Sequence, residues 1–356
     1  MKKYHKQEHD FTVGLDLSDK KSYYVILDRD GEVVEEGKVA TTTRALQRKF
    51  GNVEPMLIAL EAGTHSGWVS RLLESLGHAV LIANPRRLRM IYENKNKGDR
   101  VDAHYLARVA RVDPRLLHPI EHRTEEAQQD LMKLRARHQL VGVRTQLINS
   151  VRSMVKVLGE RLPQCSTESF PRKAAKHVPE SLRATVMPLL ATINDLTERI
   201  ASFDREVEQL CRQKYPETQV LRQIKGVGPV TALAFVLTLE NPERFRKSRS
   251  VGAYLGLIPK RDQSGDRNPQ LRITKQGDTY MRQLLVSSAH YILGHHGQDS
   301  NLRRHGEKIA ARGGKIAKKK AVVAVARKLS VLMHRLWLTG EVYEPLYNTN
   351  QREQVA

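Results

Sequence analysis

The stretch FTVGLDLSDKKSYYVILDRDGEVVEEGKVA, residues 11–40, predicts three consecutive β-strands. The first two, FTVGLDLS and KSYYVILD, are rich in the β-branched and aromatic residues that favour strands. The tetrapeptide DRDG is a turn signal, and EVVEEGKVA follows it as the third strand. We therefore expect a sheet that begins as a meander of three strands.

The next segments extend this sheet and add helices. MLIALEAG (56–63) and HAVLIANP (78–85) read as a fourth and a fifth strand, and THSGWVSRLLESLG (64–77) between them reads as a helix. A further helical stretch follows, and then DRVDAHYLARVARV (99–112). Alternation of strands and helices after a meander predicts an α/β domain, with a mixed sheet and helices on its faces.

Four acidic residues accompany the predicted strands. Asp16 lies in the first strand, Glu61 ends the fourth, and Asp99 and Asp102 lie beyond the fifth. Residues three apart share a helix face, and the strand ends and the following helix can bring all four carboxylates together. Carboxylates so clustered repel unless cations neutralise them, and Mg²⁺ or Mn²⁺ would do so and would bind substrate phosphate as well.

Each acid also has a simpler explanation. Asp99 could cap a helix with Asp102 solvated in its first turn, and Glu61 could be a surface residue at a strand end. Asp19 could also replace Asp16. The four residues on this order of strands, taken together, favour the metal site.

The charge balance of the chain points to a polyanionic partner. Among 356 residues, Lys and Arg number 60 and Asp and Glu 39, which gives a net charge of +21. Such an excess suits nucleic acid. The only cysteines, Cys165 and Cys211, are far apart, which indicates a reduced, cytoplasmic protein. The longest apolar stretch, VTALAFVLTL (230–239), is too short to span a bilayer, so we expect no membrane partner.

The central part of the chain is predicted to be helical. Residues 123–160 contain few helix breakers, and residues 161–183 contain three prolines and read as a connection. A strict 3,4 spacing of apolar residues then runs through Val186, Leu189, Ile193, Leu196, Ile200, Phe203, Val207 and Leu210. This repeat is typical of a coiled coil and predicts a homo-oligomer, a dimer or tetramer, held through residues 186–210. The alternative is a helical hairpin formed within the chain with residues 123–160.

Residues 219–345 form a third, mostly helical region with a loop at about 258–278. In IKGVGPVTALAF (224–235), Gly226 and Gly228 stand between two helical stretches, as in a helix-hairpin-helix whose backbone amides approach a phosphate. Lys318, Lys319 and Lys320 lie in a basic helix further on. We expect both elements to contact nucleic acid.

The loop at 258–278 contains a candidate nucleophile. Ser264 lies in QSG (263–265), and the loop carries the cations Arg261, Arg267, Arg272 and Lys275. Cations of this kind can hold a phosphate and stabilise the charge that develops during attack on it. By itself, QSG is more typical of a surface turn. Tyr254 is a rival nucleophile, but its apolar surroundings favour a place in the core.

Two groups of motifs resemble one family. VGLDLS, ALEAG and KGDRVDAHYLA, in this order, resemble the ribonuclease-H-like domain of RuvC-type nucleases, and more closely the DEDD transposases of insertion-sequence family 110, in its 1111 branch. AYLGLIP, QSG and ITKQGDTYMR resemble the signature of that family's second domain. The resemblance implies that Asp16, Glu61, Asp99 and Asp102 hold metal and that Ser264 forms a phosphoserine link to DNA.

The expected organisation is α/β plus α. It comprises a RuvC-like DEDD domain (10–122), a helical coiled-coil region (123–215) and a transposase domain with the serine loop (216–345). The resemblance further implies donor and target DNA as partners, a structured guide RNA encoded beside the element, and cooperation of both sites in an oligomer in a prokaryotic cytoplasm. The alternatives are a junction-resolving endonuclease and a non-catalytic nucleic-acid-binding protein.

Overall fold

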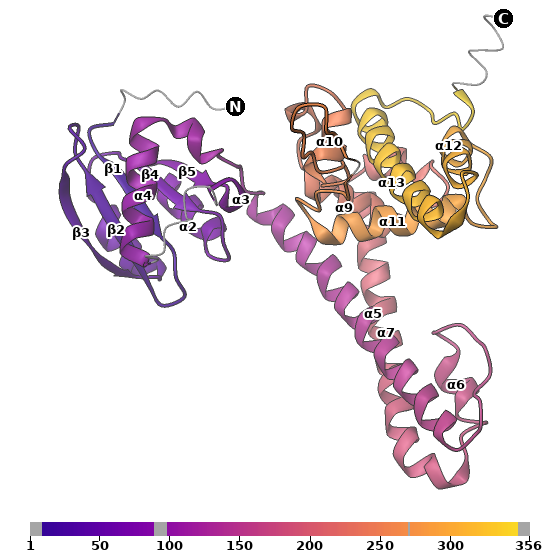
Figure 1. Ribbon diagram of the computed structural model, residues 1–356. Helices are drawn as coiled ribbons and strands as arrows, with labels where there is room; N and C mark the ends of the chain where they lie inside the picture. Colours follow the sequence, from indigo (N-terminus) through magenta and orange to yellow (C-terminus); the bar gives the residue numbers. More distant parts are fainter. Residues whose placement is uncertain (1–8, 89–97, 270, 348–356) are drawn as a thin grey trace, which may run out of the picture. The chain divides into compact units, whose positions relative to one another are not determined.

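The computed structural model describes residues 9–88, 98–269 and 271–347 (Figure 1). The chain divides into two compact units, residues 1–125 and 126–356. The predicted second and third regions, 123–215 and 216–345, thus fall almost entirely within the second unit. Within the described ranges, no helix combines the length and the apolar composition that crossing a membrane requires.

The first unit contains a mixed five-stranded sheet with the order β3-β2-β1-β4-β5. The five predicted strands are confirmed as β1 (Thr12–Asp16), β2 (Lys21–Leu27), β3 (Val33–Ala40), β4 (Leu57–Glu61) and β5 (Ala79–Ala83). β1 pairs antiparallel with β2, and β2 with β3, as a meander requires. β4 pairs parallel with both β1 and β5, and the crossover from β4 to β5 runs through α2.

Helices cover both faces of this sheet. On one face, Val13 and Leu15 of β1 pack in a core cluster with side chains of α1 (Thr43–Phe50) and α2 (Ser66–Ser75). On the other face lie α3 (Pro85–Leu88), α4 (Asp99–Val112) and a 3₁₀ turn (Pro114–Leu117), which contribute to two further clusters. The helical stretch expected after the fifth strand begins as α3 and then enters residues 89–97, which lie outside the described residues.

The second unit is helical. Its longer helices are α5 (Glu125–Val157), α7 (Arg183–Gln213), α9 (Pro229–Leu239), α11 (Thr279–Leu293), α12 (Asn301–Ala310) and α13 (Gly314–Thr339). The shorter ones are α6 (Phe170–Ala174), α8 (Thr218–Arg222), α10 (Arg249–Tyr254) and 3₁₀ turns at Glu180–Leu182 and Pro242–Arg244. α9 is apolar all round and lies buried at the centre of the main core, with α11 and α13 packed in the same cluster.

The apolar seam of α7 is buried within the chain. Near one end of α7, Val186 and Ile193 share a core cluster with Val151 of α5, and near the other end Val207 packs with Leu131 of α5. An ion pair between Lys214, just beyond α7, and Glu126 shows that the two helices run antiparallel (Figure 1). The hairpin alternative therefore describes this seam, which is covered by α5 and cannot by itself indicate an oligomer.

Candidate active site

The acidic residues of the first unit face one side of the sheet. Side chains alternate between the faces of a strand, so Asp16 points to the same side as Gly14, two residues earlier in β1. Glu61 at the end of β4 likewise shares its side with Ala59, which packs in the cluster that contains Leu106 of α4. Asp16 and Glu61 end neighbouring parallel strands, on the face that α4 covers.

Gly14 allows α4 to lie directly on β1. A Cβ atom at this position would lie 1.9 Å from the backbone oxygen of Ala103 and 2.6 Å from the backbone nitrogen of Ala107. Both alanines are fully buried, and their small side chains let the helix axis approach the strand closely. Asp99 and Asp102 lie in the first turn of the same helix, so this close approach brings them toward Asp16.

The pKa of Asp16 reports that the four carboxylates influence one another. Burial and, in decreasing order of size, the charges of Asp102, Asp99 and Glu61 together raise this pKa from 3.8 to about 6. Like charges oppose ionisation when they share a poorly solvated site. The charges of the other three predicted acids therefore all act on Asp16. That the four form one metal site stays a prediction.

The donor set fits a hard divalent cation. It consists of carboxylate oxygens, which Mg²⁺ and Mn²⁺ prefer, and a cation would relieve the mutual repulsion that raises the Asp16 pKa. Among the described residues, however, no three His, Cys, Asp or Glu side chains are grouped closely enough to form a ready-made metal cluster. Asp19, the sequence alternative to Asp16, has a side chain that is 90% exposed and pairs with His65.

A contact that the sequence did not predict fixes α4 on its other flank. Glu36 of β3 accepts a 2.7 Å hydrogen bond from Nε2 of His104 and pairs at 2.6 Å with Arg100. The hydrogen bonds from His104 and Arg100 lower the pKa of Glu36, so this carboxylate stays ionised. The contact ties the first turns of α4 to the sheet. The sequence alone could not reveal this contact, because a single acidic residue in an exposed strand is a common feature.

The candidate nucleophile lies in the second unit. Residues 256–269 and 271–278 form an irregular hairpin, and Ser264 and Arg267 close its tip through two backbone hydrogen bonds of 3.2 and 3.0 Å. Gly265, in the turn, has φ +52°, a left-handed conformation that suits glycine. Ser264 is exposed, and so are the predicted cations of the hairpin, Arg261, Arg267, Arg272 and Lys275.

Tyr254, the rival nucleophile, packs against its neighbours as a structural residue. The ring of Tyr254 packs edge-on against Phe245 at 5.3 Å, and Arg244 lies over its face at 4.7 Å. Its hydroxyl donates a 3.5 Å hydrogen bond to the carbonyl oxygen of Thr238. This agrees with the core assignment that the sequence favoured.

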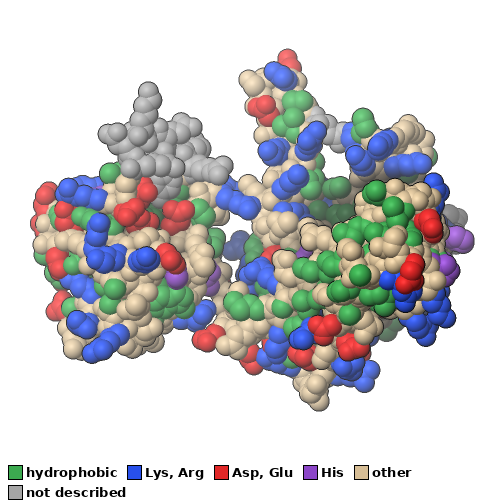
Figure 2. Space-filling model, turned by 90° about the horizontal axis from the view of Figure 1, so that it is seen from below, with side chains coloured by type: hydrophobic (Ala, Val, Ile, Leu, Met, Phe, Trp, Pro, Cys, Tyr) green, Lys and Arg blue, Asp and Glu red, His purple; other side chains and the backbone are tan. Residues whose placement is uncertain are grey.

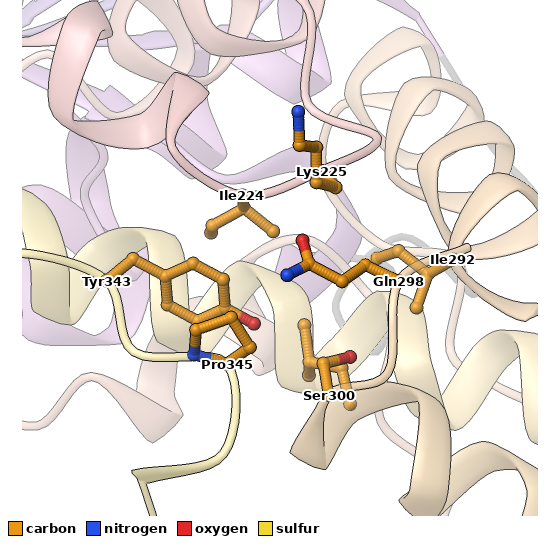
Figure 3. A pocket seen from close by; sticks show the side chains of 8 residues that line it. Ile224, Lys225, Ile292, Gln298, Ser300, Tyr343 and Pro345 are labelled. Carbon is orange, nitrogen blue, oxygen red and sulfur yellow. The ribbon is translucent and has the colours of Figure 1, made fainter. Parts of the chain in front are cut away.

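The glycines predicted to approach phosphate lie between α8 and α9. Gly226 has φ +98°, and a Cβ atom there would lie 2.9 Å from the ring of Tyr291, so the turn packs tightly on α11. Gly228 is exposed and directly precedes the first turn of α9. Behind the turn, Lys225 borders a cavity of about 10 Å³ that Tyr343 and Pro345 close (Figure 3). That volume suits about one water molecule.

The predicted lysines lie on an exposed basic surface. Lys318 and Lys319 of α13 are exposed, as is Lys320, and Figure 2 shows Lys and Arg side chains gathered along one edge of the second unit. Burial, together with the charges of Lys328 and Lys308, lowers the pKa of His305. The helices α12 and α13 thus create a positive potential.

Comparison with known proteins agrees with these observations. A family model for DEDD transposases of IS110 elements matches residues 13–159, which include all four acids. A second model, described as Transposase IS116/IS110/IS902 family, matches residues 218–305, which include Ser264. The chain belongs to the IS110/IS116/IS902 family of transposases. Membership implies DNA as the substrate, cleavage and rejoining of DNA as the activity, and a typical use of divalent metal ions.

Individual relatives carry the same kind of name. The chain is 29% identical to a "Probable family 20 transposase" of Pseudomonas aeruginosa, over 79% of this chain and 83% of that protein. It is 27% identical to the transposase for insertion sequence element IS1111A of Coxiella burnetii, over 73% of each chain. It is 25% identical to the transposase for IS1328 of Yersinia enterocolitica, over 78% of this chain and 82% of that protein.

Proposed function

We propose that this IS110-family transposase is a site-specific DNA recombinase with two cooperating sites. The ribonuclease-H-like first unit supplies the carboxylates Asp16, Glu61, Asp99 and Asp102. The second unit supplies Ser264. The observation that carries the proposal is the coupling of Asp16 to the other three acids, because such clustering is costly unless the site handles cations and phosphate.

The four carboxylates are the proposed ligands of Mg²⁺ or Mn²⁺. When bound, the metal supplies charge stabilisation to a phosphodiester whose bonds are being exchanged. The protein's own contribution is to hold Asp16 and Glu61 at adjacent strand ends and to press α4 onto β1 at Gly14. Arg100 and His104 keep the first turns of α4 in place through Glu36.

Ser264 is the proposed nucleophile. Its Oγ would bond to the phosphorus of a DNA phosphodiester while one P–O bond to a deoxyribose breaks, and the hydroxyl proton of the serine would end on the departing deoxyribose oxygen. The reverse step, with a new DNA end, rejoins the strands and frees the serine. Exposure at the hairpin tip supports this role, and the four cations of the hairpin would hold the phosphate.

Donor and target DNA are proposed to lie along the basic surfaces. The turn at Gly226 and Gly228 and the surface at Lys318, Lys319 and Lys320 would contact phosphates, which position nucleic acid without reading sequence. A structured RNA encoded by the element is proposed to select the sites by base pairing, and an oligomer to bring both sites together. Support for the RNA and the oligomer comes from the family resemblance alone.

One experiment separates this mechanism from the RuvC-like endonuclease. Purified protein is incubated with donor DNA and co-purified RNA, and denaturing gels then detect protein joined covalently to DNA. Ser264→Ala should abolish both the adduct and strand cleavage, whereas Ser287→Ala, at an exposed serine of α11, should leave them unchanged. If Ser264→Ala still cleaves DNA while Asp102→Asn does not, the carboxylates act alone as a nuclease.

The same series tests for a non-catalytic protein. DNA binding without cleavage by the wild type under all metal conditions would point to that class. Sequencing of the co-purified RNA tests the guide. A single structured RNA from the flank of the element supports guidance, and a random mixture contradicts it.

A further inference from the structure

The serine hairpin is continuous with its base through backbone hydrogen bonds. From the base to the tip, the pairs are Lys275 with Gly256, Thr274 with Ile258, Lys260 with Arg272, and the reciprocal pair Ser264 with Arg267. A shift or rotation at the base would therefore be transmitted along both arms to Ser264. The position of the nucleophile depends on how firmly the base is held.

The two arms cross at the base with no space between them. Gly256 has φ +69° and Gly277 has φ +74°, a backbone conformation that glycine adopts easily. A Cβ atom on Gly256 would lie 2.2 Å from the carbonyl oxygen of Gln276, and one on Gly277 would lie 2.1 Å from that of Tyr254. Such close backbone contact leaves several carbonyl groups turned inward, and each needs a donor.

Arg282 of α11 supplies those donors. Its Nη1 donates to the carbonyl oxygens of Gln276 at 2.5 Å, Gly277 at 3.1 Å and Leu255 at 3.3 Å, and therefore grips both arms of the hairpin. Its Nη2 donates to Oγ1 of Thr279 at 2.9 Å. The residue is 9% exposed, and its bonds to these four oxygens satisfy much of the fork.

We propose that Arg282 is a positioning residue for the nucleophilic serine, an inference that rests on the proposed function of Ser264. The buried guanidinium joins the two arms of the hairpin to α11 and thereby fixes the direction in which the tip presents its hydroxyl. Lysine cannot replace it, because an ammonium group is a point charge without the planar fork that reaches both arms.

Arg303 provides a matched control. Its Nη1 likewise donates to three carbonyl oxygens, those of Ile292, Gly294 and Gly297, and it holds a different connection, between α11 and α12. Arg282→Lys and Arg303→Lys thus remove the same kind of clamp from two loops of the same unit. Thr279→Val is a milder variant that removes one acceptor of Arg282 and keeps the shape of the side chain.

The experiment measures two quantities on the full-length protein. The first is the rate of limited trypsin cleavage after Arg261 and Arg267, which needs no catalysis. The second is the rate of covalent adduct formation at saturating donor DNA. Arg282→Lys should speed trypsin cleavage about fivefold and slow adduct formation about 10-fold to 100-fold, with DNA affinity nearly unchanged. Thr279→Val should show smaller changes in the same direction, and Arg303→Lys should show neither.

The outcomes separate the positioning role of Arg282 from the proposed nucleophilic role of Ser264. Wild-type trypsin and adduct rates in Arg282→Lys and Thr279→Val would overturn the clamp. If Arg282→Lys does not fold, Thr279→Val decides by the same two rates. If Ser264→Ala retains the adduct, the proposed nucleophile is wrong, and the trypsin rates still decide whether Arg282 holds the hairpin.

Discussion

Gly14→Ala should damage the first unit more than a single methyl group ordinarily does. The new Cβ atom would begin 1.9 Å from the backbone oxygen of Ala103, and ordinary contact begins at 3.4 Å, so α4 must move away from β1 by about 1.5 Å. The obstacle is helix backbone, which cannot rotate aside as a side chain can. Overpacking of this kind costs about 1–3 kcal/mol, and we expect a value at the upper end.

The same displacement would act on the candidate site. Asp99 and Asp102 move with α4, whereas Asp16 stays on β1, and a misplacement of about 1 Å can cost roughly 100-fold in rate. We therefore expect Gly14→Ala to lose strand cleavage even at temperatures where the protein remains folded. Urea unfolding gives the stability, and a cleavage assay with divalent metal gives the rate.

Gly67→Ala is the matched control. Gly67 lies in α2 of the same unit, and a Cβ atom there would lie no closer than 3.7 Å to the end of the Arg71 side chain. Alanine in a helix should stabilise it by about 0.5–1 kcal/mol. If Gly14→Ala unfolds at the wild-type urea concentration and cleaves at the wild-type rate, the close contact between β1 and α4 does not position the acids, and our explanation of the site fails.

Three further predictions concern charge. Asp16→Asn should stabilise the metal-free protein by about 1–2 kcal/mol at pH 7.5, as measured by urea unfolding. The rise in the pKa of Asp16 from 3.8 to about 6 corresponds to roughly 3 kcal/mol, and the partial exposure of Asp16 reduces this figure. Because ionisation of a group with a raised pKa opposes folding, this gain should vanish below about pH 4, and a less stable variant at pH 7.5 would contradict it. Asp130→Asn should cost roughly 3 kcal/mol by urea unfolding at pH 7, since Lys214 loses a 2.5 Å partner. Its hydrogen bonds lower the pKa of Asp130 against the effect of burial, so the difference should shrink as the pH falls through that pKa, and a constant difference would argue against the ion pair. Replacing Lys318 and Lys319 by Gln should reduce the slope of log affinity for DNA against log salt by about 2, and an unchanged slope would remove this surface from the interface.

The sheet was predictable because its signal is local. Strand periodicity, a DRDG turn and the helix between the last two strands place all five strands to within a few residues, and the acids then follow from the order of the strands. Helix α1 was not predicted, because only Leu46 and Phe50 mark its buried face. The close contact at Gly14 was also beyond prediction, since a glycine in a strand does not reveal what approaches it.

Partners of buried faces were harder to predict than the faces themselves. The 3,4 spacing from Val186 to Leu210 correctly identifies an apolar seam on α7. Hydrophobic burial is non-directional, however, so the spacing does not reveal which surface covers the seam. Arg282 was equally hidden. It stands at the end of a recognisable motif, but its role depends on carbonyl groups whose directions come from the positive φ angles at Gly256 and Gly277.

The antiparallel pairing of α5 with α7 makes the length of this hairpin adjustable only in fixed steps. Seven residues added to each helix would restore the seam and move the small core at the α6 end about 10 Å further from the main core of the second unit. An insertion of two or five residues in one helix alone would turn polar positions into the seam. Natural variants of this transposase should therefore differ in hairpin length by whole heptads added to both helices. Each such pair of heptads would change the distance between the two cores by about 10 Å.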